Sequence, residues 1–279
     1  MHTSVKPVEI TKVTARSRSA RPDLMAVEEP LEIRLGHGSA SDRQQVNLAV
    51  TMRTPGHDFE LATGFLYTEG IIDSFHQVES IKYCEDVGRQ EDKENVVRVE
   101  LKPDVVVDIG KLHRNFYTSS SCGVCGKASI EAVRVNCKPL SDHLKIRVKD
   151  ILSLPAKLRQ AQQIFEHTGG LHAVGLFTAK GKLLRTREDV GRHNAMDKII
   201  GASLVEGEIP IAEAVLIVSG RASFELVQKA LRAGVPVMAA VGAPSSLALS
   251  LARAGEMTLL GFVKESGFNV YCGGHRVMD

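Results

Sequence analysis

The sequence has few of the features that mark membrane, secreted or nucleic-acid-binding proteins. No apolar run approaches the roughly 20 residues that a helix needs to cross a bilayer, and the first 25 residues lack the apolar core of a secretory signal. Cysteine is scarce, with five residues in 279, and its mostly isolated positions do not form a secreted disulfide framework. The formal net charge of +2 is too small to indicate binding to nucleic acid or to a membrane. We therefore expect a cytoplasmic protein with neither of these partners.

The first half of the chain divides into an arm and a small domain. Residues 1–25 have more basic than acidic side chains and are predicted to be a disordered arm. Residues 26–145 are predicted to form a small α+β domain. Its expected elements are strands at 31–35, 46–53, 80–84, 95–101 and 105–109, a helix at 57–72 that Asp58 caps, and a helix at 127–135.

Residues 146–279 alternate apolar strands and helices with tight glycine turns. A helix over 154–170 is expected to have Ser153 as its cap, Pro155 in its first turn and a glycine pair at its end. It is followed by hairpin strands at 171–178 and 183–188, and then by helices at 191–201, 223–234 and 245–255 that alternate with strands at 214–220, 235–242 and 257–263. This rhythm predicts an α/β fold whose C-terminal domain is a three-layer mixed sheet with helices on both faces.

Two turns in this domain are candidates for binding an anion. In VSGRASFE and VGAPSSLA, an apolar strand leads through glycine and small hydroxyl residues into a helix. Such turns present free N–H groups and the positive end of a helix dipole at the carboxyl edge of an open sheet, where ligands bind. The simpler interpretation is that the serines only cap the helices. The candidate phosphate contacts are Ser219, Arg221, Ser223, Ser245 and Ser246.

The stretch EDVGRHNAMDKIIG, residues 188–201, gathers charged side chains around a helix start. Within it, His193 is a candidate proton shuttle or ligand contact, because the imidazole pKa lies near neutral pH. A solvated, salt-bridged helix face is the simpler interpretation, and the sequence leaves both open.

Two of the five cysteines, Cys122 and Cys125, lie three positions apart in SSSCGVCGKASIE, residues 119–131. A structural zinc site would need two more ligands, for which the sequence offers only Cys272 and His275 in CGGH. The zinc deaminase signature is absent. The motif CGVC also has the form of a thioredoxin-like dithiol. In the thioredoxin fold, however, the motif follows an early strand of a compact domain, whereas here it follows an irregular segment in the middle of the chain. A thiolate before a helix start and close to Lys127 has a lowered pKa, which favours Cys122 as a sulfur carrier.

Five stretches in this order and spacing, SCGVCGK, HAVGLF, EDVGRHNAMDK, SGRASFELVQKA and GFVKESGFNVY, closely resemble the FdhD family of sulfur carrier proteins that mature formate dehydrogenase. The resemblance runs from about residue 25 to the C-terminus. It implies that a cysteine desulfurase gives sulfur to the protein as a persulfide. The protein then passes the sulfur to the molybdenum of the bis(molybdopterin guanine dinucleotide) cofactor.

The same resemblance assigns roles to particular residues. The persulfide would form on Cys122, the first cysteine of the motif, with Cys125 beside it. The larger domain would have a cytidine-deaminase-like fold without zinc chemistry, the protein would be a homodimer, and GDP would bind as a fragment of the cofactor. A thiol-disulfide oxidoreductase and a zinc-stabilised binding module are the alternatives. The family's cofactor-binding stretch corresponds to Phe262, Val263, Lys264, Glu265, Ser266 and Gly267.

Overall fold

The structure is a computed structural model of the 279-residue chain, and it describes every residue except 1–2, 86–87, 89–92, 104, 108–139 and 141–142. Its larger unit is built on a six-stranded sheet with the strand order β13-β12-β11-β10-β8-β9. The central strands β10, β11 and β12 are parallel, whereas β8, β9 and β13 run antiparallel to their neighbours. The strands are β8 (His172–Thr178), β9 (Leu183–Asp189), β10 (Ala214–Val218), β11 (Val237–Ala240), β12 (Thr258–Lys264) and β13 (Gly267–Cys272).

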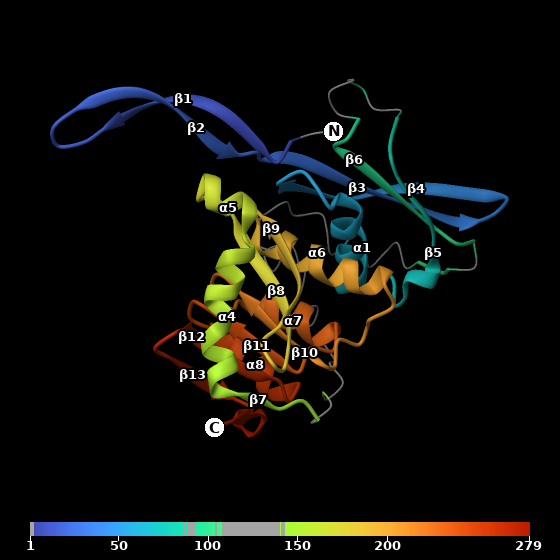
Figure 1. Cartoon of the computed structure of the whole chain (residues 1–279). Helices are drawn as coiled ribbons and strands as arrows, with labels where there is room; N and C mark the ends of the chain where they lie inside the picture. Colours follow the sequence, from blue (N-terminus) through green and yellow to red (C-terminus); the bar gives the residue numbers. More distant parts are fainter. Residues whose placement is uncertain (1–2, 86–87, 89–92, 104, 108–139, 141–142) are drawn as a thin grey trace.

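Helices cover both faces of this sheet, as Figure 1 shows. Helix α4 (Val148–Ala161) packs Ile151, Leu154 and Leu158 against alternate side chains of β8, β10, β11 and β12 on one face. Helices α6 (Arg192–Val205), α7 (Phe224–Arg232) and α8 (Ser246–Ala254) bury their apolar side chains on the other face. Strands that are apolar on both sides need cover on both sides. The predicted three-layer mixed sheet is confirmed.

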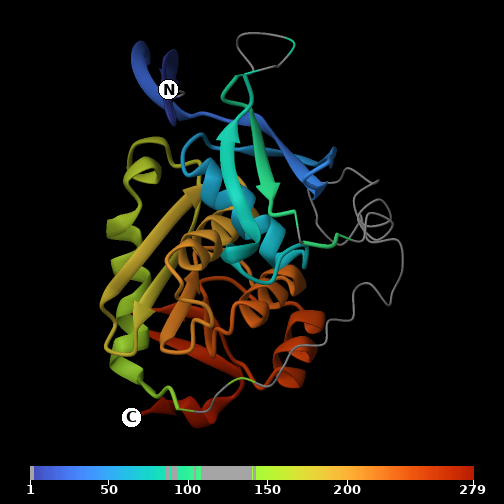
Figure 2. The ribbon, with the colours of Figure 1, turned by 90° about the vertical axis from the view of Figure 1, so that its right-hand side faces the viewer.

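The smaller unit is an α+β layer that lies against α6. Its four-stranded sheet has the order β4-β3-β6-β5, and α1 (Asp58–Thr68) lies between this sheet and α6 (Figure 2). Gly64 of α1 and Gly201 of α6 meet at the crossing, where a Cβ on either would overlap a backbone carbonyl of the other helix. One core cluster of buried residues therefore runs through both units. The strands are β3 (Glu29–Ser39), β4 (Asp42–Arg53), β5 (Val78–Tyr83) and β6 (Val96–Leu101), and the 3-10 helix η1 (Phe75–Gln77) precedes β5.

The prediction that residues 1–25 form a disordered arm is wrong for the residues of this segment that the structure describes. Strands β1 (Val5–Val13) and β2 (Arg18–Ala26) form an antiparallel ribbon with nine paired positions. The ribbon is fixed at its base, where the Ser4 hydroxyl donates to the Pro55 carbonyl (2.7 Å) and Val27 N–H donates to the Ser4 carbonyl (2.9 Å). Its strands bury little apolar surface, so their sequence lacks the alternation that predicts a half-buried strand.

Several boundaries also differ from the prediction. Helix α4 begins at Val148, so Ser153 does not cap it and Pro155 lies in its interior. Asp58 is the first residue of α1 rather than its cap, because its carboxylate pairs with the buried Arg53. No strand forms at 105–107. The short helix α5 (Gln163–Thr168) ends at Gly169 as expected. The prediction also missed β13, the paired strands β7 (Ile146–Arg147) and β14 (Val277–Met278), and η3 (Gly274–Arg276).

Candidate functional site

The candidate site lies where the parallel strands end. Because β10, β11 and β12 run in one direction, the turns after them emerge at the same edge of the sheet. Three hydrogen bonds join the first two turns: Gly242 N–H to the Gly220 carbonyl (2.9 Å), Ala222 N–H to the Ala243 carbonyl (3.2 Å) and Ser245 N–H to the Ala222 carbonyl (3.0 Å). The structure thus brings together the two serine-containing turns that the sequence singled out.

The hydroxyl groups of these turns are partly engaged within the protein. Ser219 accepts a hydrogen bond from Ala173 N–H of β8 (2.9 Å), and Ser245 accepts one from Ala248 N–H at the start of α8 (3.2 Å). For Ser245 the capping interpretation is therefore confirmed. Arg221 is exposed between β10 and α7, and Ser246 is exposed in the first turn of α8. Arg221 is thus the side chain of these turns that can most readily meet an anion.

His193 lies beside the end of the first turn, at the start of α7. Its Nε2 atom is 3.4 Å from the Ser223 hydroxyl and 3.9 Å from the Glu225 carboxylate. The neighbouring His193 imidazole is the main cause that lowers the pKa of Glu225 to about 2, against the opposing effect of burial. Glu225 also accepts from its own backbone N–H group. The positive end of the α7 dipole is therefore already paired with a carboxylate of the protein itself.

A buried carboxylate holds the start of α6, which carries His193. Asp189, which is fully buried, accepts from Gly191 N–H (2.8 Å), from the Asn194 amide (3.1 Å) and from Thr54 N–H of the smaller unit (3.2 Å). It also pairs with the buried Lys198 amine at 2.7 Å. A charge buried in this way is stable only when its hydrogen-bonding positions are satisfied. These bonds fix the start of α6, and with it Arg192 and His193, at the sheet edge.

Sequence reasoning missed two cationic or titratable side chains at this edge. His172, the first residue of β8, is paired with Asp189 across β8 and β9. Burial, and then the charges of Arg192 and His193, lower the pKa of His172, so its imidazole is neutral at pH 7. The Arg192 Nε atom is buried and has no hydrogen-bond partner among the described residues. Both side chains lie in stretches that carry the family resemblance, HAVGLF and EDVGRHNAMDK, and this is the signal that could have found them.

The predicted stretch 262–267 completes the edge and continues into β13. Phe262 N–H donates to the Gly242 carbonyl (3.1 Å), so this stretch lies directly beside the turn after β11. Phe262 has a φ of 53° and a side chain that is 43% exposed, an unusual backbone conformation for an aromatic residue. Lys264, Glu265 and Ser266 are exposed at the hairpin that leads to Gly267.

One residue of that stretch cannot offer its side chain to a ligand. Val263 is fully buried in the core between the sheet and α4. Its expected contact with a cofactor could therefore involve only its backbone.

The cysteine pair is a different case, because Cys122, Cys125 and Cys137 lie outside the described residues, as does the predicted helix at 127–135. Cys272 and His275 line a cavity of about 240 Å³ together with Arg253, Glu256, Met257 and Gly273. This cavity is at the amino end of β12, opposite the candidate site. Burial raises the pKa of the Cys272 thiol, which donates to the Met257 carbonyl (3.2 Å). In the described part of the chain, no three histidine, cysteine or acidic side chains are placed to hold a metal ion.

Comparison with known proteins extends over nearly the whole chain. Residues 26–278 match the model of the FdhD/NarQ family. Among the similar chains named "Sulfur carrier protein FdhD", one from Mycolicibacterium paratuberculosis is 50% identical over 274 residues, which covers 96% of this chain and 97% of that one. Its counterpart from Streptomyces avermitilis is 49% identical over 275 residues, covering 96% and 94% of the two chains.

More distant relatives match as completely. A chain of the same name from Saccharolobus solfataricus is 40% identical over 277 residues, covering 99% of this chain and all of that one. The crystal structure of a Desulfotalea psychrophila protein, assigned as a formate dehydrogenase accessory protein, superposes with a TM-score of 0.76 at 23% identity. It covers 99% of this chain and 100% of its own, and at that identity it shows the fold. None of the described helices has the length and apolar content needed to cross a membrane.

Proposed function

The chain belongs to the FdhD/NarQ family, and from that premise we propose that it is a sulfur carrier that serves formate dehydrogenase. The observation that carries this proposal is the identity of about half of all residues, over 96% of the chain, with proteins named as sulfur carriers. At that identity the fold is expected to be shared. The name of the Desulfotalea psychrophila protein points to the same dehydrogenase.

We further propose that Cys122 receives the sulfur. Its thiolate would attack the terminal sulfur of a persulfide on a cysteine desulfurase. A new S–S bond forms on Cys122, the donor's S–S bond breaks, and the donor cysteine leaves as a thiolate. In the sequence Lys127 follows Cys122 by five positions, and a cation that lies near the thiol would favour its thiolate form. Cys125, three positions further along the same motif, would relay or protect this sulfur.

The proposed acceptor is the molybdenum of the bis(molybdopterin guanine dinucleotide) cofactor, bound as a substrate. The diphosphate groups of this cofactor are negatively charged and would be bound by cationic side chains. At the sheet edge these are the exposed Arg221 and Arg192, whose Nε atom is buried without a hydrogen-bond partner among the described residues. The guanine bases of the cofactor would stack on flat apolar surfaces, and the exposed ring of Phe262 is such a surface. Because Glu225 already pairs with the start of α7, the arginines are better candidates for phosphate contacts than the N–H groups of that helix.

The partners that follow from this function are a cysteine desulfurase as donor, formate dehydrogenase as recipient and a second copy of the chain in a homodimer. The proposed location is the cytoplasm. These assignments rest on the family resemblance.

Mass spectrometry tests the sulfur-carrier function directly. The full-length chain is incubated with a cysteine desulfurase and cysteine, and the peptide that contains Cys122 is then examined without reductant. We expect the mass of one added sulfur atom on that peptide, and none on the same peptide of a Cys122→Ser variant. If the incubation yields only a disulfide between Cys122 and Cys125, the protein is an oxidoreductase and the proposal is wrong.

A further inference from the structure

The β1–β2 ribbon is a surface for which sulfur chemistry gives no role. Among the described residues no third strand pairs with it, and residues 11–22 are all exposed. Figure 1 shows the ribbon projecting from the body past α5. A two-stranded ribbon is only marginally stable alone in water, and its edges present unpaired backbone groups that a partner can bind. The ribbon therefore has the form of an element that binds a partner protein through its exposed edges.

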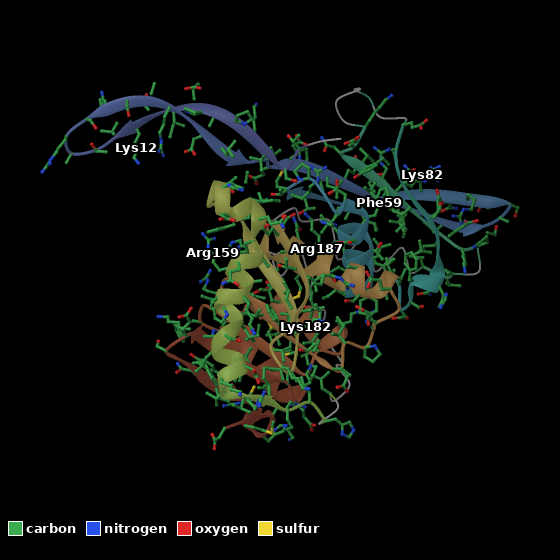
Figure 3. All side chains as sticks on the ribbon, viewed as in Figure 1. Lys12, Phe59, Lys82, Arg159, Lys182 and Arg187 are labelled. Atoms are coloured by element: carbon green, nitrogen blue, oxygen red, sulfur yellow. The ribbon has the colours of Figure 1, made fainter. Side chains whose placement is uncertain are left out.

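The ribbon is positively charged. Its exposed cations outnumber its two acids, Glu9 and Asp23, and none of these cations forms an ion pair within the described structure. Arg159 is a further exposed cation at the end of α4, below α5 in the view of Figure 3, which labels it together with Lys12. Such a surface attracts an acidic partner and speeds its association. The five ribbon cations are Lys6, Lys12, Arg16, Arg18 and Arg21.

Apolar side chains lie among these charges. Val13 is 58% exposed, Leu24 is 39% exposed and Met25 is 57% exposed. Cations, chiefly arginine, interspersed with apolar side chains are characteristic of surfaces that bind proteins. Residues 1–58 include no phenylalanine, tyrosine or tryptophan, so the ribbon lacks the rings on which single-stranded nucleic acid stacks. These features favour a protein as the partner.

The base of the ribbon is connected to the candidate site. At the base of the ribbon, the Ser4 hydroxyl donates to the Pro55 carbonyl. Thr54, the residue before Pro55, is hydrogen-bonded to both members of the buried pair Asp189 and Lys198. The Thr54 hydroxyl also accepts from Val190 N–H (3.2 Å). That pair fixes the start of α6, which presents His193 at the sheet edge. A partner held by the ribbon is thus held on the side of the molecule where cofactor would bind.

We propose that the β1–β2 ribbon is a docking arm for an acidic surface of formate dehydrogenase. The ribbon would hold the dehydrogenase at the sheet edge from which it receives the sulfur-loaded cofactor. This inference rests on the proposed function, since it takes the dehydrogenase as the recipient. It assigns the ribbon to the recipient and not to the sulfur donor.

A charge-reversal experiment tests the inference. Binding of the full-length chain to its cofactor-free formate dehydrogenase is measured by biolayer interferometry at about 50 and about 300 mM salt. The test variant is Lys12→Glu/Arg16→Glu/Arg18→Glu at the distal end of the ribbon. The matched control is Lys82→Glu/Lys93→Glu/Lys102→Glu, which reverses three exposed lysines of the smaller unit. Figure 3 shows Lys82 and Lys12 at opposite sides of the molecule.

We expect the ribbon variant to bind the dehydrogenase at least about ten-fold more weakly at low salt, with a smaller dependence on salt, and the control to bind as the wild type does. Equal affinities of wild type and ribbon variant would overturn the inference, and so would an equal loss in the control. The inference would also be overturned if the wild type did not bind the dehydrogenase. It would be overturned as well if binding to a DNA duplex, measured in the same way, were the only affinity that the ribbon variant lost.

Persulfide formation on Cys122 separates this inference from the function on which it rests. We expect a desulfurase to load the ribbon variant as fully as the wild type. Normal loading of both proteins without any effect on dehydrogenase binding would refute the docking arm and leave the sulfur carrier standing. Loss of loading in the ribbon variant alone would assign the ribbon to the sulfur donor and would contradict the proposal.

Discussion

At the scale of single residues, Arg221 is the side chain most directly tied to the proposed cofactor. It is exposed between β10 and α7 at the edge where Arg192, His193 and Phe262 also lie. A charge-assisted hydrogen bond to phosphate contributes on the order of 1.5 to 3 kcal/mol, so Arg221→Ala should weaken GDP binding by about ten-fold or more. Calorimetric titration with GDP checks this, with Arg253→Ala at the opposite end of the sheet as the control. Equal GDP affinities for Arg221→Ala and wild type would remove Arg221 from the site.

The three cysteines outside the motif are expected to have no part in sulfur transfer. Cys272 is half-buried and its thiol is held protonated, and Cys84 follows β5 as a partly buried free thiol. We expect a Cys84→Ala/Cys137→Ala/Cys272→Ala variant to load persulfide to the same stoichiometry as the wild type. Loss of loading by a triple variant with an unchanged circular dichroism spectrum would place one of these thiols in the relay.

The candidate site was predictable from sequence where residues follow a parallel strand, and less so where a contact depends on tertiary packing. The turns after β10 and β11 could be placed together because parallel strands end at one edge. That Glu225 pairs with the start of α7, and that Val263 faces the core, depend on which way each side chain turns. Neither follows from spacing alone.

At the scale of elements, the crossing of α1 and α6 depends on two glycines. A Cβ at Gly64 would overlap the carbonyl of Asp197, and one at Gly201 would overlap the carbonyl of Glu60. Both obstacles are backbone atoms, so the helices themselves would have to separate. We expect Gly64→Ala to lower the free energy of unfolding by at least about 2 kcal/mol. Denaturant titration measures this.

Gly170→Ala is the matched control for that prediction. Its Cβ would meet the Ala26 side chain at an ordinary distance of 3.7 Å, in the turn after α5. Its free energy of unfolding should stay close to that of the wild type. If Gly64→Ala were as stable as this control, the close packing of α1 on α6 would be wrong.

An ion pair between α1 and β9 links the two units and should give a pH dependence. Burial opposes ionisation of Glu60, but hydrogen bonds from Arg187 (2.6 and 2.7 Å) and from His57 outweigh it and lower the pKa of Glu60 to about 2, from 4.5 when unfolded. A carboxyl with a lowered pKa in the folded state stabilises the protein above its unfolded pKa. That contribution is lost as the pH falls from about 4.5 through about 2.

Glu60→Gln should therefore flatten the decrease in stability across that range of pH and lower stability at pH 7, by on the order of 1 to 3 kcal/mol. Glu166→Gln, which changes an exposed carboxyl of α5, is the control and should leave the curve unchanged. Urea titrations at several pH values give the measurement. A curve for Glu60→Gln that runs parallel to the wild-type curve would mean that this pair does not couple to folding.

Elements with a buried face were predictable, and exposed ones were not. The helices and strands of the six-stranded sheet have the periodicity that burial imposes, so the sequence predicts their order. The β1–β2 ribbon has mostly exposed side chains and β13 has no fully buried one, and the pairing of these strands is specified by backbone hydrogen bonds that leave little pattern in the sequence. Helix α4 was placed too late because Pro155, normally a first-turn residue, lies in its interior.

At the scale of the whole molecule, the protein combines a sheet edge fixed by buried hydrogen bonds with a projecting ribbon. Core packing across α1 and α6, together with the bonds from Thr54 to Asp189 and Lys198, joins the smaller unit to the larger one. The ribbon extends from the outside of this joined body, and the segment with Cys122 connects β6 to β7. We infer a division of labour in which the sheet edge binds the cofactor, Cys122 carries sulfur to it and the ribbon holds the recipient.

The central claim is that Cys122 carries the sulfur, and formate dehydrogenase activity in cells tests it most directly. Cells that lack their own copy of this protein are supplied with wild type, Cys122→Ala or Cys125→Ala at equal protein levels. The account predicts that Cys122→Ala abolishes dehydrogenase activity while the dehydrogenase protein is still made, and that Cys125→Ala lowers activity less. Normal dehydrogenase activity with Cys122→Ala would contradict the account.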